Sequence, residues 1–106
     1  MLHVHLIVAE AISDEAAREL ARVAQEHGHV TAEAPGFVSV KVDVEEDGRM
    51  ILITTTWTAR AAMLAYIVGC SQRQFAAATA HLLLGNFVTK VFQRAAEVSR
   101  ATEVPS

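Results

Sequence analysis

The sequence is poor in cysteine, proline and large aromatic residues: its 106 residues include one cysteine, two prolines, one tryptophan and one tyrosine. A single cysteine excludes an internal disulfide bond. Lysine and arginine number 9 against 12 acidic residues, so the chain lacks the basic character that nucleic-acid binding needs. Apolar runs are interrupted well before they reach about eighteen residues, and the start lacks the basic pattern of a signal peptide. We therefore expect a cytoplasmic protein without a membrane segment.

Apolar residues, by contrast, are abundant. They make up 52% of the chain, while charged residues make up only 20%. A chain this short has little interior in which to bury so much apolar surface. We therefore expect a homodimer, in which a second copy covers part of that surface. The length corresponds to one domain, predicted over residues 1–100, with a loose C-terminal tail over residues 101–106.

The hydrophobic pattern predicts four strands and two helical regions. The strands are expected at residues 2–9, 37–44, 50–57 and 87–98, and the helices at residues 14–27, 59–68 and 71–84. Gly28 is expected to end the first helix, and Thr58 to cap the second. Ser71, followed three residues later by Gln74, predicts a capping box for the last helical segment.

Three of these elements have faces that the spacing defines. On the first strand, His3, His5 and Ile7 share one face. The first helix carries one apolar stripe, formed by Ala17, Leu20, Val23, Ala24 and His27. In the second strand the four valines from Val38 to Val44 share a face, which places Phe37 on the opposite one. The acidic turn at residues 45–48 then closes a hairpin.

The order of the elements is β-α-β-β-α-β. It predicts an α+β protein of the ferredoxin-like class, with an antiparallel sheet and both helical regions on one face. The other face of the sheet is uncovered in a monomer, although several strands place apolar residues on it. Two such faces packed together would form a dimeric α+β barrel.

The hairpin region resembles a known family. Pro35-Gly36-Phe37, the strand ending in Thr-Trp-Thr at residues 56–58, and the Ala-Arg-Ala-Ala helix start at residues 59–62 are similar to the antibiotic biosynthesis monooxygenase (ABM) domain. The resemblance spans nearly the whole chain in order and spacing. It implies a dimeric α+β barrel and a cofactor-independent monooxygenase that acts on an aromatic or polyketide-type small molecule in secondary metabolism.

Members of this family differ in activity, and the chain lacks residues that are typical of two of its groups, the anthrone oxygenases and the haem degraders. Anthrone oxygenases place an asparagine and a tyrosine where this sequence has Ile53 and Met63. Haem degraders place a histidine on the second helix, and His81 is out of step with that position. Haem degradation is therefore not expected, and no cofactor is predicted.

A second resemblance points to an alternative activity. His5-Leu6-Ile7-Val8 and Tyr66-Ile67 are similar to plant polyketide cyclases of the same barrel superfamily, in which a first-strand histidine, a helix tyrosine and a second histidine shape an aldol-type ring closure. The second histidine falls at Gln72 here. A polyketide cyclase and a non-catalytic dimeric small-molecule-binding protein therefore stay open beside the oxygenase.

The candidate catalytic residues are His5 and Tyr66. An imidazole titrates near neutrality and can accept a proton from a carbon acid or a phenol, and a tyrosine hydroxyl can donate a hydrogen bond to a substrate oxygen. The pocket for a small apolar or aromatic substrate is expected between the sheet and the helices. Its predicted substrate-binding residues are Trp57, Gln72, Met63, Phe75 and His3.

The remaining histidines raise the question of a metal. His3 and His5 form a His-x-His pair on a strand, which could supply two ligands of a metal site. Such a site needs a third ligand, and His81 is the candidate for it. No cysteine pair and no group of carboxylates supports this pair, so no metal is predicted. His27 and His29 flank the predicted end of the first helix and are expected to be solvated.

Overall fold

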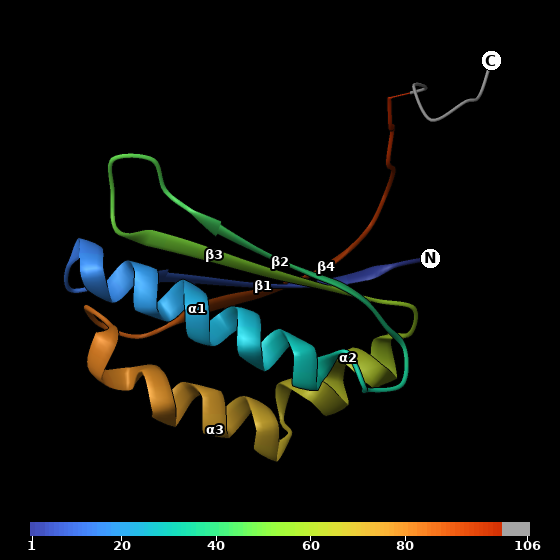
Figure 1. Ribbon diagram of the computed structural model, residues 1–106. Coiled ribbons are helices and arrows are strands. Elements are labelled where there is room, and N and C mark those ends of the chain that lie inside the picture. Colours follow the sequence, from blue (N-terminus) through green and yellow to red (C-terminus); the bar gives the residue numbers. More distant parts are fainter. Residues whose placement is uncertain (101–106) are drawn as a thin grey trace.

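The computed structural model describes residues 1–100. Its regular elements are β1 (His3–Glu10), α1 (Asp14–Thr31), β2 (Phe37–Val44), β3 (Met50–Trp57), α2 (Arg60–Ile67), α3 (Cys70–Thr79), the 3₁₀ turn η1 (Ala80–Leu82) and β4 (Val88–Gln93). All strand pairs are antiparallel, in the order β2-β3-β1-β4. Figure 1 shows the helices on one side of the sheet. The predicted ferredoxin-like α+β fold is confirmed, whereas the tail predicted over 101–106 lies outside the described residues.

The core lies between the sheet and the helices. Because side chains alternate along a strand, His5, Ile7 and Ala9 of β1 all face α1 and are buried. Ile53 of β3 pairs with Ile7 and is buried beside it. From the helix, Leu20 is fully buried against these residues, which contributes about 2 kcal/mol of hydrophobic stabilisation.

Helix α1 runs four residues further than predicted, and Gly28 lies within it. A Cβ atom at Gly28 would come within 2.8 Å of Val40 Cγ1, so the glycine allows α1 to pack closely on β2. The last turn is held by the Thr31 hydroxyl, which donates to the His27 carbonyl at 3.0 Å, and by the Ala32 N–H, which donates to the Gly28 carbonyl at 2.9 Å. The glycine is needed for this close approach, not for a helix end.

The predicted caps of the later helices are wrong. α2 starts after Ala59 and α3 after Gly69, and neither cap residue makes a side-chain hydrogen bond. Only residues 68–69 separate the two helices, so α3 begins at Cys70 and Ser71 lies inside its first turn. At α1, in contrast, the Ser13 side chain caps the helix by accepting a hydrogen bond from the Ala16 N–H at 3.0 Å.

Phe37 lies on the helix-facing side of the sheet, opposite to the prediction. A bulge between Phe37 and Ser39 shifts the register, so that Phe37 pairs with Trp57 and Val40 pairs with Thr55. The extra residue interrupts the alternation on which the face assignment rested. As a result the rings of Phe37 and Trp57 meet edge to face, with centroids 5.6 Å apart.

The last helical segment and the last strand are both shorter than predicted. α3 ends at Thr79, and beyond η1 the Leu84 N–H donates to the Glu10 carbonyl at 2.7 Å, which ties this segment to the end of β1. β4 ends at Gln93, whose partner is His3, the first residue of β1. One residue further on, the Arg94 N–H still donates to the Leu2 carbonyl at 2.8 Å.

The sheet face away from the helices carries apolar residues on three strands, as predicted. Five of them are Leu6, Val8, Leu52, Val88 and Phe92, whereas β2 places Ser39, Lys41 and Asp43 on the same face. Val88 and Phe92 are 56% and 51% exposed. None of the helices in residues 1–100 covers this face (Figure 1). No helix in the same range is long and apolar enough to cross a membrane.

Candidate functional site

His5 lies in the middle of β1, directed at the helices and only 2% exposed. Its neighbours across the strands are Thr55 on β3 and Val91 on β4. The Nδ1 atom is buried and has no hydrogen-bond partner among residues 1–100. Burial lowers the pKa of His5 below its usual value of 6.5, so the imidazole is neutral at pH 7. A neutral imidazole with a free nitrogen can accept a proton.

Tyr66 of α2 lies against His5. The two rings meet edge to face, with centroids 5.9 Å apart and an interplanar angle of 74°. Burial raises the pKa of Tyr66 to about 12. The phenol therefore stays protonated at neutral pH and is available as a hydrogen-bond donor. The two predicted catalytic residues are thus neighbours in the fold.

Trp57 forms the wall beside Tyr66. It is fully buried at the end of β3, and its ring centroid lies 5.0 Å from that of Tyr66. Its indole N–H donates to the Thr55 hydroxyl at 2.9 Å, which satisfies a polar group that burial would otherwise leave unpaired. This bond and the Phe37 contact hold the indole in one orientation.

His27 is the site residue that sequence reasoning missed, because the expectation that it is solvated is wrong. Its ring stacks on Phe75 of α3 with centroids 4.9 Å apart, and it lies 6.4 Å from the Tyr66 ring. Its position on the apolar stripe with Leu20 and Ala24 was the available signal. The predicted helix end at Gly28 obscured this signal, because α1 in fact continues for another turn.

Gln72 of α3 accompanies His27. Burial lowers the pKa of His27, and a contact with the Gln72 side chain, which approaches the imidazole without reaching hydrogen-bond geometry, raises it by a smaller amount. His27 Nε2 and Gln72 Oε1 are both buried without a hydrogen-bond partner among residues 1–100. The site therefore contains two neutral imidazoles, from β1 and α1, on either side of Tyr66.

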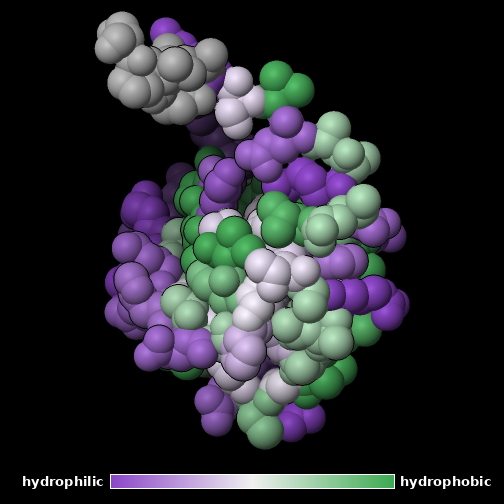
Figure 2. All heavy atoms as spheres, turned by 90° about the vertical axis from the view of Figure 1, so that its right-hand side faces the viewer, coloured by the Kyte–Doolittle hydropathy of each residue, from purple (hydrophilic) through white to green (hydrophobic). Residues whose placement is uncertain are grey.

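Two spaces adjoin Tyr66. The inner one is a cavity of about 10 Å³, enough for one water molecule, and is lined by Ile7, Ala24, His27, Gly28, Thr31, Val40, Ile53, Thr55, Tyr66 and Phe75. The outer one is a groove of about 510 Å³ lined by Val30, Thr31, Glu33, Ala34, Pro35, Ala62, Ala65, Tyr66, Gly69, Cys70 and Ser71. Figure 2 shows apolar atoms gathered over the end of the molecule where α2 lies. Thr31 and Tyr66 line both spaces and form the boundary between them.

The structure does not bring all the predicted substrate-binding residues together. Trp57, Phe75 and Gln72 surround the rings of His27 and Tyr66. His3 and Met63 instead line a separate hollow of about 210 Å³ between α2 and β4. Within residues 1–100 no three His, Cys, Asp or Glu side chains lie close enough to share a metal ion.

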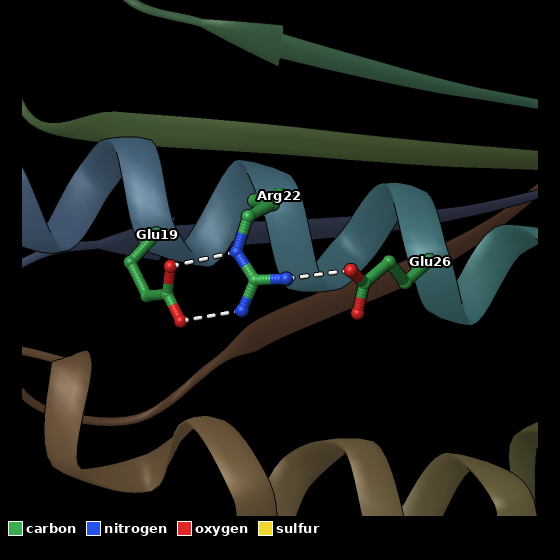
Figure 3. A network of polar contacts seen from close by, with 3 residues as sticks. All are labelled: Glu19, Arg22 and Glu26. Carbon is green, nitrogen blue, oxygen red and sulfur yellow. Dashed lines mark hydrogen bonds and ion pairs between the residues drawn. The ribbon is translucent and has the colours of Figure 1, made fainter.

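A larger groove of about 730 Å³ lies between the polar side chains of α1 and the apolar side chains Phe37, Val40 and Val42 of β2. Its Arg22 guanidinium donates two hydrogen bonds to Glu19, at 2.8 and 2.7 Å, and one to Glu26 (Figure 3). These bonds and charges raise the pKa of Arg22 and occupy three of its five N–H donors. Because Arg22 is committed to its own helix, we place the candidate site at Tyr66.

No family model and no curated protein matches the sequence. Solved structures match the fold. SnoaB, a cofactor-independent oxygenase from Streptomyces nogalater, has a TM-score of 0.78 and 17% identity over 93% of this chain and 98% of its own. ActVA-Orf6, a monooxygenase of Streptomyces coelicolor in complex with the ligand nanaomycin D, has a TM-score of 0.79 and 17% identity over 93% and 92%. An antibiotic biosynthesis monooxygenase has a TM-score of 0.71 and 14% identity over 91% and 100%.

These neighbours confirm the resemblance to ABM domain proteins that the Pro-Gly-Phe hairpin indicated. They match the chain over nearly its full length and share its α+β fold. At such low identities the likeness establishes the fold. What this chain does has to be argued from its own site.

Proposed function

We propose that the protein is a cofactor-independent monooxygenase that acts on a flat aromatic or polyketide-type small molecule. One observation carries the proposal. A buried, neutral His5 with a free Nδ1 stands beside a protonated Tyr66 in apolar surroundings. This is a base next to a hydrogen-bond donor, which is the pair needed to remove a proton and stabilise the resulting oxyanion. The structural neighbours that are oxygenases support it.

The substrate binds in the apolar groove with its reacting edge toward Tyr66. His5 accepts a proton from an activated C–H or phenol group of the substrate, and the Tyr66 hydroxyl donates to the oxyanion that forms. The resulting carbanion transfers an electron to O₂, and the two radicals combine to a peroxide anion, which takes the proton back from His5 and becomes a hydroperoxide. His5 then removes the remaining hydrogen of that carbon as a proton while the O–O bond breaks, which leaves a new carbonyl group and a hydroxide. The hydroxide takes this proton from His5, so that one oxygen atom ends in the product and the other in water.

Access to His5 requires a movement of Tyr66, because His5 lines neither of the two spaces and lies behind the Tyr66 ring. The cavity of about 10 Å³ cannot hold an aromatic ring, whereas the groove of about 510 Å³ can. Because Tyr66 lines both spaces, rotation of its side chain would join them. Tyr66 thus has two roles in the proposal, as hydrogen-bond donor and as the boundary that a substrate displaces.

The test is oxygen uptake by metal-stripped protein supplied with anthrone or a quinol. We expect His5→Ala to lower the rate by about 10²- to 10⁴-fold, the usual contribution of a general base. His81→Ala, at an exposed site on η1, is the matched control and should leave the rate unchanged. Absence of uptake across a broad panel of phenols and anthrones would contradict the proposal.

A cyclase acting in the same site is the second candidate, and His27 is the observation that favours it. The resemblance to the cyclases implies a second histidine in the site, but this sequence has Gln72 at the matching position. In the fold His27 lies beside Tyr66 and Gln72, so a second imidazole is present. Product formation under strictly anaerobic conditions separates the two candidates, because ring closure by aldol chemistry consumes no oxygen.

We further propose that the protein is a homodimer joined through the open face of the sheet. The five apolar side chains on that face support this assembly. Burying them against a second copy would remove the largest apolar surface that the helices leave exposed. Sedimentation equilibrium measures the assembly, and a monomer at micromolar concentration would contradict it.

A further inference from the structure

Three buried side-chain polar atoms in residues 1–100 lack a hydrogen-bond partner, and all three belong to this site. They are His5 Nδ1, His27 Nε2 and Gln72 Oε1. Native proteins pair the great majority of their buried polar atoms, so three such atoms beside one tyrosine are unusual. They come from β1, α1 and α3, while Tyr66 comes from α2. Four separate elements therefore direct hydrogen-bonding groups into one small region.

The packing holds His27 in place, and its approach to Gln72 falls short of hydrogen-bond geometry, so Nε2 keeps its hydrogen-bonding capacity. Its ring is stacked on Phe75, and the close approach of α1 to β2 at Gly28 seats it against the sheet. Gln72 is suited to accompany it, because rotating its amide by 180° exchanges a donor for an acceptor. The pair can therefore bind either a carbonyl or a hydroxyl oxygen.

Charge limits which ligands the region accepts. Within residues 1–100, no lysine or arginine lines the cavity or the groove, and Glu33 is the only charged residue that lines either. Arg73 is exposed and donates to the sulfur of Cys70, a residue that lines the groove, at 3.1 Å. A carboxylate brought to His27 would lose its hydration without gaining a cation.

We propose that His27 and Gln72 form an oxygen subsite that selects flat aromatic ligands carrying an uncharged hydroxyl or keto oxygen. The ring occupies the apolar groove, and the oxygen reaches past Tyr66 to the two unpaired side chains. The inference rests on the proposed function in taking the Tyr66 region as the ligand site. It concerns binding alone, so it is tested without oxygen or turnover.

The experiment compares three ligands of one shape: 2-naphthol, naphthalene and 2-naphthoate. Isothermal titration calorimetry at pH 7 gives their affinities for the intact protein. We expect 2-naphthol to bind about tenfold more tightly than naphthalene, as one or two buried hydrogen bonds would provide, and more tightly than 2-naphthoate. Equal affinities for naphthol and naphthalene, or no binding of naphthol up to its solubility limit, would overturn the proposal.

Matched variants assign the effect to the two residues. Gln72→Met and His27→Phe should each reduce the preference for naphthol over naphthalene to about twofold or less. Gln74→Met and His29→Phe change the exposed neighbours on the same helices and should leave it intact. If Gln72→Met retains the full preference, the subsite is wrong even where oxygen uptake is observed. Conversely, selective binding of naphthol without oxygen uptake would contradict the proposed oxygenase activity and support the oxygen subsite.

A measurement on the unaltered protein covers the case in which a variant does not fold. In ¹⁵N-detected NMR spectra of the histidine side chains, naphthol should shift the His27 imidazole resonances. The His29 and His81 resonances, which come from exposed side chains, should stay in place. Unmoved His27 resonances at saturating naphthol would contradict the proposal.

Discussion

The two faces of the sheet are made by the same strands, yet they differ in what covers them. On the face toward the helices, Ile7, Ile53 and Trp57 are at most 4% exposed. On the other face, Val88 and Phe92 of β4 are each more than half exposed. The helices of one chain cover the first face over β1 and β3, although Val91 of β4 on that face is 53% exposed, and they leave the second face open.

This difference separates two kinds of apolar residue that composition alone treats as equal. The covered face gains its stability within one chain and holds the candidate site, since His5 lies on it. The open face gains stability only when something is placed against it. The 52% apolar content therefore divides into a core that folds the chain and a surface available for association. Substitutions on the two faces should behave differently, and the following predictions test this.

The largest effect is expected at Trp57. Trp57→Ala should lower the free energy of unfolding by about 3–5 kcal/mol, because it empties a fully buried site. Phe92→Ala on the open face should cost less than about 1 kcal/mol when measured at concentrations where the chain is monomeric. Urea titrations followed by circular dichroism measure both. Equal losses would show that the two faces contribute alike to the monomer.

The next effect concerns association. Leu52→Asp places a charge at the centre of the open face and should weaken the proposed dimer by about 100-fold or more, since an unpaired charge would be buried in it. Sedimentation equilibrium measures the dissociation constant. Ala77→Asp, at an exposed position on α3, is the control. If both variants associate as the parent does, the open face is not the interface.

A smaller effect is expected from the acceptor of the Trp57 indole. Thr55→Val keeps the shape of the side chain but removes that acceptor, so unfolding should become about 1–3 kcal/mol easier. Thr54→Val, one residue earlier and on the open face, should change stability by less than about 0.5 kcal/mol. In a Trp57→Phe background the Thr55 penalty should largely disappear. Its persistence there would show that Thr55 acts through another contact.

The smallest effect is a dependence of stability on pH. The folded protein lowers the pKa of His5 and His27, so below pH 6.5 the unfolded chain binds more protons. Stability should be constant just above pH 7 and fall as the pH drops below 6.5, by at most about 1.4 kcal/mol per pH unit for each histidine. Denaturant titrations at pH 7.5 and 5.5 measure the loss. His27→Phe should reduce it and His29→Phe should not; the reverse would contradict the burial of His27.

Much of the fold was predictable because its signals are local. The two strands at residues 37–44 and 50–57 and the acidic turn between them depend on neighbours in sequence, and the structure has each of them. The errors share a different cause. Gly28 and Phe37 were misassigned because close helix packing and a bulge arise from contacts with distant strands.

The candidate site follows the same division. His5 and Tyr66 were identified from the first strand and second helix, and the fold places their rings 5.9 Å apart. His27 was missed because its burial depends on the length of α1 and on Phe75 of α3. His3 shares the strand face of His5, but it lies at the end of β1 and lines another hollow.

By itself, the sequence determined the order of strands and helices, the antiparallel hairpin and the excess of apolar surface, because periodicity and composition encode these directly. Only the tertiary structure decided which polar side chains meet. His5, His27 and Gln72 are far apart in the chain, and their convergence on Tyr66 depends on how four elements pack. That packing leaves three polar atoms buried without partners, and no local pattern of residues specifies such an arrangement.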